Sequence, residues 1–314
     1  MTERNIPEQT VLVTGATGFL GRLLVDRLIT EGYRITAIGC KSAISIFDPA
    51  VEYIQVDMTS GEQAREALKP WRWNAVINLA GPVVREEGTW QESYPFIRNH
   101  LAIALNLCMC LPERWEGRCI HISSMSVYGT PQRLPMDEYH QRLPLNCYGI
   151  AKALAEEVFE SWHGRYLNNY WLMRFPGLFS EERRSGALYN FISAAYRGKP
   201  LVVSASKPTP WDILHVSDAV EALTRAIRID SHDSGPINIS YGEAVELKVI
   251  ARLIIEITQS KSEVQNLHDI YHPVFQMDIS RARQLLNWPP YTLRQRLKQL
   301  CADIASKAGT KDVA

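Results

Sequence analysis

The sequence predicts an α/β protein, with a doubly wound parallel sheet covered by helices and a smaller C-terminal lobe. Short β-rich runs alternate with helical stretches through the first half of the chain. One of these runs, 75–79, is apolar without alternation, as expected of a strand buried on both faces of a parallel sheet. Beyond 175 the alternation ends, and proline, glycine and polar residues cluster at 175–186 and 198–212. The change in character predicts the separate lobe.

The first half is predicted to hold a series of strands joined by helices. The predicted strands are 10–14, 34–38, 52–56, 75–79, 119–123 and 170–175. The predicted helices are 21–31, 94–111 and 148–162, and Gly32 stands where a helix C-cap is expected. Helix 94–111 is apolar on most of its circumference, although a helix that covers a sheet needs only one apolar stripe. We therefore predict a homodimer through helices near 94–111 and 148–162, with deep burial inside the chain as the alternative.

The second half is predicted to add helices at 188–197, 217–228 and 247–259. A short strand and a helix start follow at 277–286, with Asp278 or Ser280 as the possible N-cap. The predicted domains are 1–177 with about 211–232 for the sheet domain, and 178–210 with 233–306 for the lobe. The tail, 307–314, is expected to be frayed.

Composition narrows the class of partner. Lys plus Arg number 34 and so do Asp plus Glu, so a net charge near zero gives no reason to expect nucleic acid or an anionic membrane as a partner. The six cysteines lack CxxC spacing, the N-terminus lacks the apolar core of a signal peptide, and the longest apolar run is too short to span a bilayer. None of the eight histidines stands at ligand spacing from cysteines or carboxylates. We expect a soluble cytoplasmic protein without a metal.

A glycine-rich turn follows the first predicted strand, with Gly15, Gly18 and Gly21 spaced as TGxxGxxG. Such a turn lets the backbone approach a pyrophosphate, and the helix that follows supplies N–H donors and the positive end of its dipole. An ordinary tight turn is the alternative, but the position at the first strand of an alternating chain favours a Rossmann-type dinucleotide site.

The choice of dinucleotide should be set at the end of the second strand, where a carboxylate would bind the adenosine ribose diol. Here Gly39 stands in that stretch, and Lys41 and Ser42 follow. A carboxylate would repel a 2′-phosphate, whereas a cation and a hydroxyl would accept it. This pattern favours NADP over NAD, although Lys41 could also be a solvated loop cation. Asp57, after the third strand, is placed to accept from the adenine amine or simply to form a turn.

Tyr148 and Lys152 stand four residues apart on a predicted helix, so their side chains share one face. A nearby ammonium favours the phenolate and should lower a phenol pKa that is otherwise about 10. Beside a dinucleotide, such a pair predicts proton transfer at a carbon that bears a hydroxyl or a carbonyl.

With these motifs, the chain resembles the extended short-chain dehydrogenase/reductases of the NAD-dependent epimerase/dehydratase type, whose best-known members act on nucleotide sugars. The match runs from Val11 to Trp288. Further segments carry it: Asn78-Leu79-Ala80-Gly81, Asn99, Ser123-Ser124-Met125-Ser126-Val127-Tyr128-Gly129, Ile213-Leu214-His215-Val216-Ser217-Asp218, Asn238-Ile239-Ser240 and 278–289.

The resemblance implies that Tyr148 is the acid/base, that Lys152 holds the nicotinamide ribose, and that Ser124 hydrogen-bonds the reacting oxygen. The residues expected to contact the cofactor are Gly15, Thr17, Gly18, Phe19, Leu20, Gly39, Lys41, Ser42, Asp57, Met58, Leu79, Ala80, Gly81, Asn99, Ser123, Tyr148, Lys152, Phe175 and Pro176. Those expected on the substrate side are Val83, Ser124, Met125, Ser126, Tyr148, Arg183 and Trp211. His215 is expected to be a hydrogen-bonded core residue rather than a catalytic one.

Departures from the family pattern restrict the reaction. Met125 and Ser126 replace the Asp-Glu pair of the 4,6-dehydratases, so dehydration is not expected. Trp211 stands where sugar-nucleotide enzymes often carry an arginine for the diphosphate. Arg183 and Arg184 could take over that role, or they could form a solvated loop.

The leading expectation is an NADP-dependent reductase of a keto group on a sugar, expected to be nucleotide-linked and reduced at the 4-keto position, with Tyr148 as the proton donor. The alternative is a nucleotide-sugar 4-epimerase that retains NAD. A non-catalytic dinucleotide-binding regulator is the third reading, and the intact serine, tyrosine and lysine argue against it.

Overall fold

The chain divides into two compact units in a computed structural model that describes residues 9–42, 46–82, 89–113, 115–162, 169–183, 186–203, 210–229, 233–266 and 274–308. Unit 1 comprises Met1–Gly129, Gln141–Arg174 and Val220–Ile237. Unit 2 comprises Thr130–His140, Phe175–Ala219 and Asn238–Ala314. These bounds differ from the expected domains at four places: 130–140, 175–177 and 211–219 group with unit 2, and 233–237 groups with unit 1.

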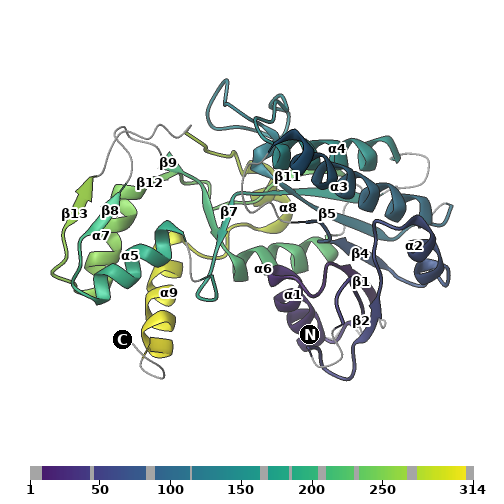
Figure 1. Cartoon of the computed structure of the whole chain (residues 1–314), viewed down its shortest axis with the longest axis horizontal. Helices are drawn as coiled ribbons and strands as arrows, with labels where there is room; N and C mark the ends of the chain where they lie inside the picture. Colours follow the sequence, from purple (N-terminus) through teal and green to yellow (C-terminus); the bar gives the residue numbers. More distant parts are fainter. Residues whose placement is uncertain are drawn as a thin grey trace. The chain divides into compact units, whose positions relative to one another are not determined.

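Unit 1 is built on a seven-stranded sheet (Figure 1). Its order is β11-β6-β5-β4-β1-β2-β3, and the pairs around β1 are parallel, with Val11 opposite both Ile35 and Ala75. The strands are β1 (Thr10–Thr14), β2 (Arg34–Gly39), β3 (Glu52–Gln55), β4 (Ala75–Asn78), β5 (Arg118–Ser124), β6 (Tyr170–Phe175) and β11 (Gly235–Asn238). The six predicted strands are therefore confirmed to within a residue or two, and the fold class with them.

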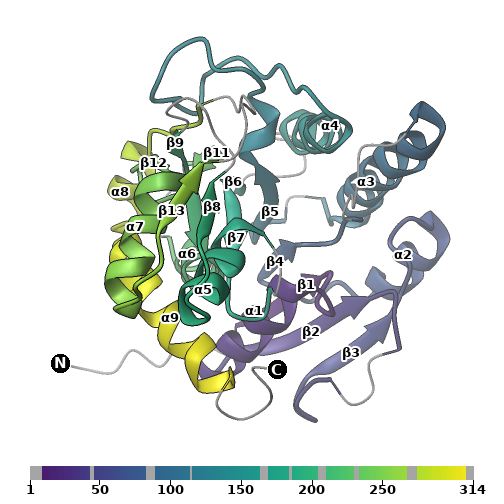
Figure 2. The same ribbon diagram turned by 60° about the vertical axis from the view of Figure 1, so that its left-hand side comes forward.

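Helices cover both faces of this sheet (Figures 1 and 2). On one face, α3 (Trp90–Cys110) packs between α2 (Gly61–Leu68) and α4 (Cys147–Trp162). Their apolar side chains form one core with the strands, including Leu107, Phe159 and Leu172. On the other face, α1 (Phe19–Thr30) meets α6 (Val216–Ile227), where Arg27 pairs with Glu221 at 3.1 Å.

Helix α1 ends as the sequence predicts. Gly32 follows its last turn with φ +83°, in the left-handed region that residues with a Cβ rarely adopt, and its N–H donates to the Ile29 carbonyl. The chain can therefore turn sharply into β2 and bring the carboxyl end of that strand back beside β1.

Unit 2 consists of short strand pairs and helices. Strand β7 (Gly177–Phe179) pairs with β10 (Ile213–His215), β8 (Leu201–Val203) with β13 (Val264–Asn266), and β9 (Pro210–Trp211) with β12 (Val245–Glu246). The helices of this unit are α5 (Ala187–Tyr196), α7 (Leu247–Thr258), α8 (Ser280–Leu286) and α9 (Leu293–Ala308). Inside the unit, Asp218 accepts hydrogen bonds from Tyr241 and Arg296, which joins α6 to α9.

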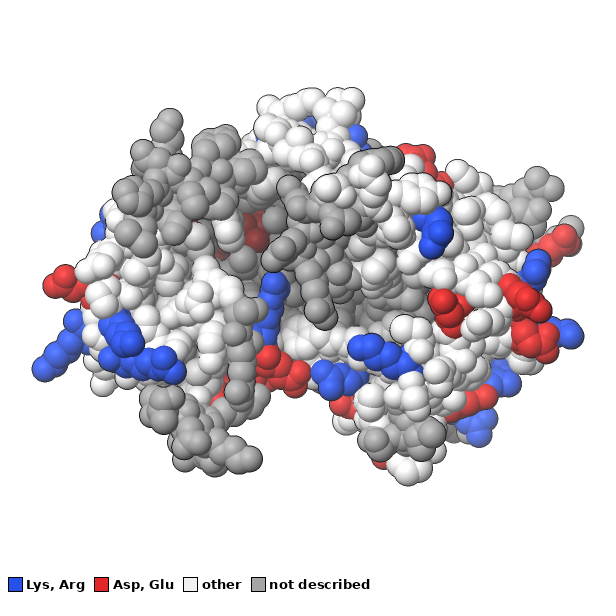
Figure 3. All heavy atoms as spheres, viewed as in Figure 1, with Lys and Arg blue, Asp and Glu red and all other residues white. Residues whose placement is uncertain are grey.

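Charges are mixed over the described part of the face seen in Figure 3, where Lys and Arg alternate with Asp and Glu without a broad area of one sign. Among the described residues, no helix combines the length and the apolar character needed to cross a membrane.

Candidate active site

The glycine-rich turn leaves no room for side chains where the backbone passes closest to its neighbours. Gly15 has φ +66°, and a Cβ there would lie 2.7 Å from the Ala80 nitrogen. A Cβ on Gly21 would lie 2.4 Å from the Gly15 carbonyl oxygen. The next helix, α1, begins at Phe19 and has no side-chain cap, so its first N–H groups are available to a ligand.

A series of buried side-chain hydrogen bonds connects the ends of neighbouring strands beside this turn. Thr14 donates to the side chain of Asn78 at 2.6 Å, and Asn78 contacts the His121 ring nitrogen at 3.0 Å. The N–H of Ala80 donates to Thr14 at 3.3 Å. These bonds place the segment after β4 against the glycine turn. The role of His121 could not be predicted from the sequence, because a lone histidine in an apolar strand cannot be told apart from an ordinary core residue.

The predicted catalytic residues come together at the carboxyl end of β5 and the start of α4. Ser124 is the last residue of β5 and hydrogen-bonds Tyr148, which lies in the first turn of α4. Lys152, one turn later and buried, donates to the Ile122 carbonyl at 2.9 Å and lies 5.9 Å from the centre of the Tyr148 ring. The spacing of four residues therefore places both side chains on the same face of α4, while their catalytic roles remain predictions.

The electrostatics of the pair differ from the expectation. Burial raises the pKa of Tyr148, and the hydrogen bond to Ser124 only partly offsets this effect. Burial also lowers the pKa of Lys152 to about 8, against the opposing attraction of Glu156. The predicted lowering of the phenol pKa by lysine is thus wrong for the protein alone, because both groups are buried and the ammonium bonds a carbonyl instead.

The serines around Ser124 have separate positions, which the sequence left open. Ser126 contacts the Ser124 hydroxyl at 3.2 Å, and its N–H donates to that same oxygen. The Ser123 side chain is instead buried in the interior of unit 1, on the side of Glu156. Ser126 therefore fixes the Ser124 hydroxyl, whereas the Ser123 side chain belongs to the core.

His100 is a neighbour of Tyr148 that sequence reasoning missed. Its ring meets the Tyr148 ring edge-on with the centres 6.5 Å apart, and its Nε2 contacts the Pro82 carbonyl at 2.9 Å. Burial, and then the charge of Lys152, lower its pKa to about 3, so the ring is neutral and Nε2–H donates. A Cβ on Gly81 would lie 2.2 Å from this ring. His100 thus connects the segment after β4 to the tyrosine.

The remaining predicted cofactor contacts lie at the same edge of the sheet or in unit 2. Thr17, Phe19, Leu20, Leu79 and Asn99 are half-buried around the strand ends. Asp57 is exposed and accepts from Thr59, and Met58 is buried in the core, so only its backbone could reach a ligand. Phe175 and Pro176 are buried and belong to unit 2.

Most of the predicted substrate contacts remain predictions. Val83 and Arg184 lie outside the described residues. In unit 2, Arg183 is exposed and donates to the Leu178 carbonyl at 3.0 Å, and Trp211 lies in β9. His215 is buried in the same unit, accepts from the Ser217 N–H at 3.2 Å and packs on Phe179, as a core histidine should. In the described part of the chain, no His, Cys, Asp or Glu side chains gather in a group that could hold a metal ion.

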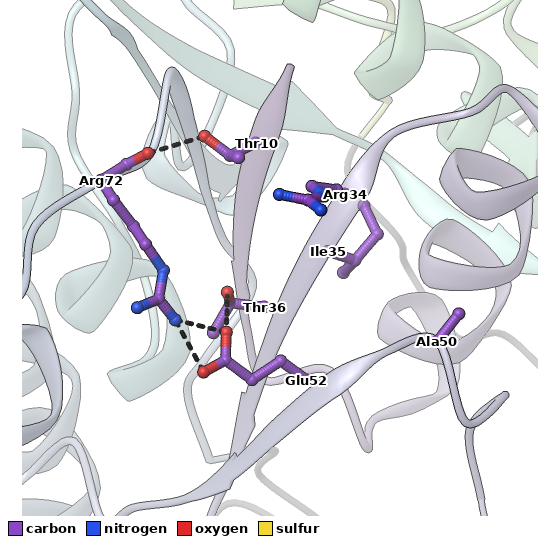
Figure 4. A pocket seen from close by; sticks show the side chains of 7 residues that line it. All are labelled: Thr10, Arg34, Ile35, Thr36, Ala50, Glu52 and Arg72. Atoms are coloured by element: carbon purple, nitrogen blue, oxygen red, sulfur yellow. Dashed lines mark hydrogen bonds and ion pairs between the residues drawn. The ribbon is translucent and has the colours of Figure 1, made fainter. Parts of the chain in front are cut away.

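A pocket of about 290 Å³ opens at the opposite edge of the sheet, at the amino ends of β1, β2 and β3 (Figure 4). Inside it, Arg72 points toward Glu52 and is bonded to it at 2.6 Å, and Glu52 also accepts from Thr36. Ligands of parallel α/β sheets bind at the carboxyl ends of the strands. This pocket, whose lining residues Arg72 and Glu52 pair with each other, is therefore not the candidate active site.

The region of the chain that matches known proteins contains both the glycine turn and the Ser124–Tyr148–Lys152 cluster. The model of the NAD dependent epimerase/dehydratase family matches residues 11–240. The chain belongs to this family. The matched region starts in β1 and contains the glycine turn, the three clustered residues and Asn238.

Family members similar to this chain include epimerases and decarboxylases. UDP-glucose 4-epimerase of Azospirillum brasilense is 24% identical over 313 residues, which cover 92% of this chain and 90% of the relative. UDP-glucuronic acid decarboxylase 3 of Arabidopsis thaliana is 25% identical, and the matched region covers 90% of this chain and 85% of the relative. A tyrosine-to-phenylalanine mutant of UDP-glucuronic acid 4-epimerase of Bacillus cereus, solved with UDP-4-deoxy-4-fluoro-glucuronic acid and NAD, has a TM-score of 0.80 at 19% identity and covers 95% of this chain and 100% of its own. The sequence identification of the family is thereby confirmed.

Proposed function

We propose that this chain is a nucleotide-sugar 4-epimerase, which oxidises and then re-reduces one carbon with a retained dinucleotide. The observation that carries the proposal is the buried Ser124–Tyr148–Lys152 cluster at the carboxyl edge of a parallel sheet whose first turn is shaped for a pyrophosphate. The relatives described above are 4-epimerases and a decarboxylase, so they favour the epimerase over the reductase that the sequence placed first.

The residues present fit a dinucleotide. Gly15 and Gly21 leave a cradle that a Cβ would fill, and α1 starts beside it with uncapped N–H groups. Gly15, Gly18 and the first turn of α1 would hold the pyrophosphate, and Lys152 would hold the ribose next to the nicotinamide. When bound, the group supplies reversible hydride acceptance at the substrate carbon.

The chain's own residues would handle the proton. Tyr148 would take the proton of the C4 hydroxyl when that carbon is oxidised to a ketone, and would return the proton when the ketone is reduced. The Ser124 oxygen accepts from the Ser126 N–H, and its hydroxyl proton would turn to donate a hydrogen bond to the substrate's C4 oxygen. The burial that raises the Tyr148 pKa means that the phenolate needs positive charge nearby, and Lys152 is the cation in place.

Two features of the sequence bear on alternatives. All three catalytic side chains are present and together, which argues against a non-catalytic regulator. Met125 and Ser126 still stand in place of the dehydratase Asp-Glu pair. The reductase differs from the epimerase in one measurable respect: it consumes external reduced cofactor in every turnover.

The test is a panel of UDP-hexoses and UDP-hexuronic acids incubated with the protein and no added cofactor, followed by NMR of the sugar. We expect a mixture of C4 epimers. Tyr148→Phe should lower kcat by roughly 10²–10⁴-fold, whereas Tyr139→Phe, a control at an exposed tyrosine, should leave it unchanged. Loss of carbon dioxide without inversion would overturn the proposal, and so would NADPH-dependent reduction of a UDP-4-keto-hexose by a protein that inverts none of the panel.

A further inference from the structure

The turn after β2, at the expected ribose end of the dinucleotide site, is fixed from the neighbouring strand. The Tyr53 hydroxyl, on β3, lies 3.1 Å from the Gly39 carbonyl oxygen and makes a second, short hydrogen bond to the Lys41 carbonyl. Gln55 donates to the Cys40 carbonyl at 3.4 Å. Three consecutive carbonyls of the turn are thus bound by two side chains of β3.

Tyr53 is itself held in place. Its ring packs on Phe47 with the centres 5.6 Å apart, and burial raises the pKa of its phenol, so the hydroxyl remains a donor at neutral pH. The Gly39 carbonyl also accepts from the Val56 N–H at 2.9 Å, which continues the ladder between β2 and β3. The turn is therefore a rigid extension of the sheet.

This arrangement leaves no space for a side chain at position 39. A Cβ on Gly39 would lie 2.8 Å from the Tyr53 hydroxyl and 2.9 Å from the Thr17 side chain. An acid here, of the kind that binds a ribose diol and rejects a 2′-phosphate, is missing from the sequence, and a side chain at this position would require the Tyr53 hydroxyl or the Thr17 side chain to move.

Beyond Gly39 the turn presents a cation and a hydroxyl to solvent. Lys41 and Ser42 are both exposed. Within the described part of the chain, neither side chain has a hydrogen-bond or ion-pair partner. An ammonium on a rigid turn, with no competing carboxylate bonded to it, is a ready phosphate ligand.

We propose that this turn is a 2′-phosphate subsite, in which Tyr53 keeps position 39 empty and holds the backbone from which Lys41 and Ser42 bind the phosphate. The chain would then accept a 2′-phosphorylated dinucleotide, whereas the Bacillus cereus relative was solved with NAD. The inference rests on the proposed dinucleotide site, but it concerns binding alone and needs no turnover.

The test compares two fragments that occupy only the adenosine end, 2′,5′-ADP and 5′-AMP, by calorimetry on protein freed of bound dinucleotide. We expect 2′,5′-ADP to bind about tenfold or more tightly, and the preference to shrink at high salt because the contact is exposed. Lys41→Ala should remove most of the preference and leave 5′-AMP binding unchanged. Lys69→Ala, at an exposed lysine that follows α2, is the matched control and should change neither.

A second variant tests the tyrosine. Tyr53→Phe keeps the ring on Phe47 but removes both carbonyl hydrogen bonds, so the preference for 2′,5′-ADP should fall several-fold while melting of the protein stays cooperative. Equal or tighter binding of 5′-AMP by the unaltered protein, or equal losses for both fragments in Lys41→Ala, would overturn the inference. Neither result would contradict the epimerase proposal. Conversely, a failure to observe C4 inversion would not change the expected preference for 2′,5′-ADP over 5′-AMP.

Discussion

Among single residues, Lys152 links function to stability because its charged ammonium is buried. Burying this charge lowers the free energy of unfolding of the protein. The Lys152 ammonium donates to the Ile122 carbonyl, and burial lowers its pKa from 10.5 to about 8. The folded chain releases this proton at a lower pH than the unfolded chain does. The free energy of unfolding should therefore rise with pH between about 8 and 10.5, and the burial cost is complete at pH 7.

Replacing this lysine should stabilise the protein while removing its function. Lys152→Met is expected to raise the free energy of unfolding at pH 7 by about 1–3 kcal/mol, and the gain should fade as the pH approaches 10.5. Chemical denaturation at pH 7 and pH 10 measures both. The exposed change Lys69→Met serves as the control. A variant that is less stable than the parent at pH 7 would show that the buried charge is compensated.

The glycine turn allows a second test at this scale. Gly15→Ala should cost at least about 1–2 kcal/mol through its positive φ alone, and more through the contact with Ala80. We also expect it to abolish dinucleotide binding. Gly177→Ala, which has open space around it, is the matched control. Thermal melting with and without dinucleotide measures both the loss of stability and the loss of binding. If Gly15→Ala bound the dinucleotide normally, the glycine turn would not be the pyrophosphate site.

At the scale of elements, α4 is tied to the sheet by a buried ion pair one turn beyond Lys152. Glu156 accepts from Arg174 of β6 at 2.9 and 2.6 Å, and Arg174 also donates to Tyr128. Burial opposes the charge of Glu156, but the hydrogen bonds from Arg174 and its neighbours hold the pKa of this carboxyl below its usual range. The pair fixes the register of α4 against the sheet, and with it Tyr148.

Removing one partner of this pair should cost more than removing both. Arg174→Met leaves the fully buried Glu156 carboxylate with Arg142, at 2.9 Å, as its remaining cation, and is expected to destabilise the protein by up to about 3–5 kcal/mol. Combining it with Glu156→Leu should restore much of that loss. Denaturant unfolding of the two single variants and the double variant gives the coupling. Additive losses would show that the two side chains act independently.

Most elements of unit 1 could be predicted from the sequence, because strands buried in a parallel sheet are continuous apolar runs and its helices begin or end at recognisable residues. Helix α2 was not predicted: Gly61–Leu68 is short and charged, and only Ala64 and Leu68 are buried. At α8 the expected N-cap residues act differently, since Asp278 accepts from the Ser280 N–H while Ile279 occupies the cap itself.

The catalytic residues could be predicted because they lie within one helical turn and one strand end. His100, Glu156 and Tyr53 could not, since their roles depend on which strands become neighbours in the sheet. No local pattern reports that Tyr53 meets Gly39, or that Arg174 meets Glu156 across the core.

At the scale of the whole molecule, α3 and α4 of unit 1 still carry large exposed apolar side chains, among them Tyr94, Met109 and Leu154. The predicted homodimer would cover this surface. Light scattering should then give twice the chain mass of 35.7 kDa, and Leu154→Glu should yield a folded monomer. If the unaltered protein were a monomer, the predicted homodimer would be wrong. The proposed active site does not depend on this outcome.

The proposed epimerase oxidises and re-reduces one carbon of the sugar with the same bound dinucleotide. A UDP-hexose carrying deuterium at C4, incubated with the purified protein and no added cofactor, tests it most directly. We expect C4-inverted sugar that keeps its deuterium, with none released to solvent or to free cofactor, and no inversion with Tyr148→Phe. Unchanged sugar, or inverted sugar whose C4 deuterium has passed to solvent or to free cofactor, would contradict it.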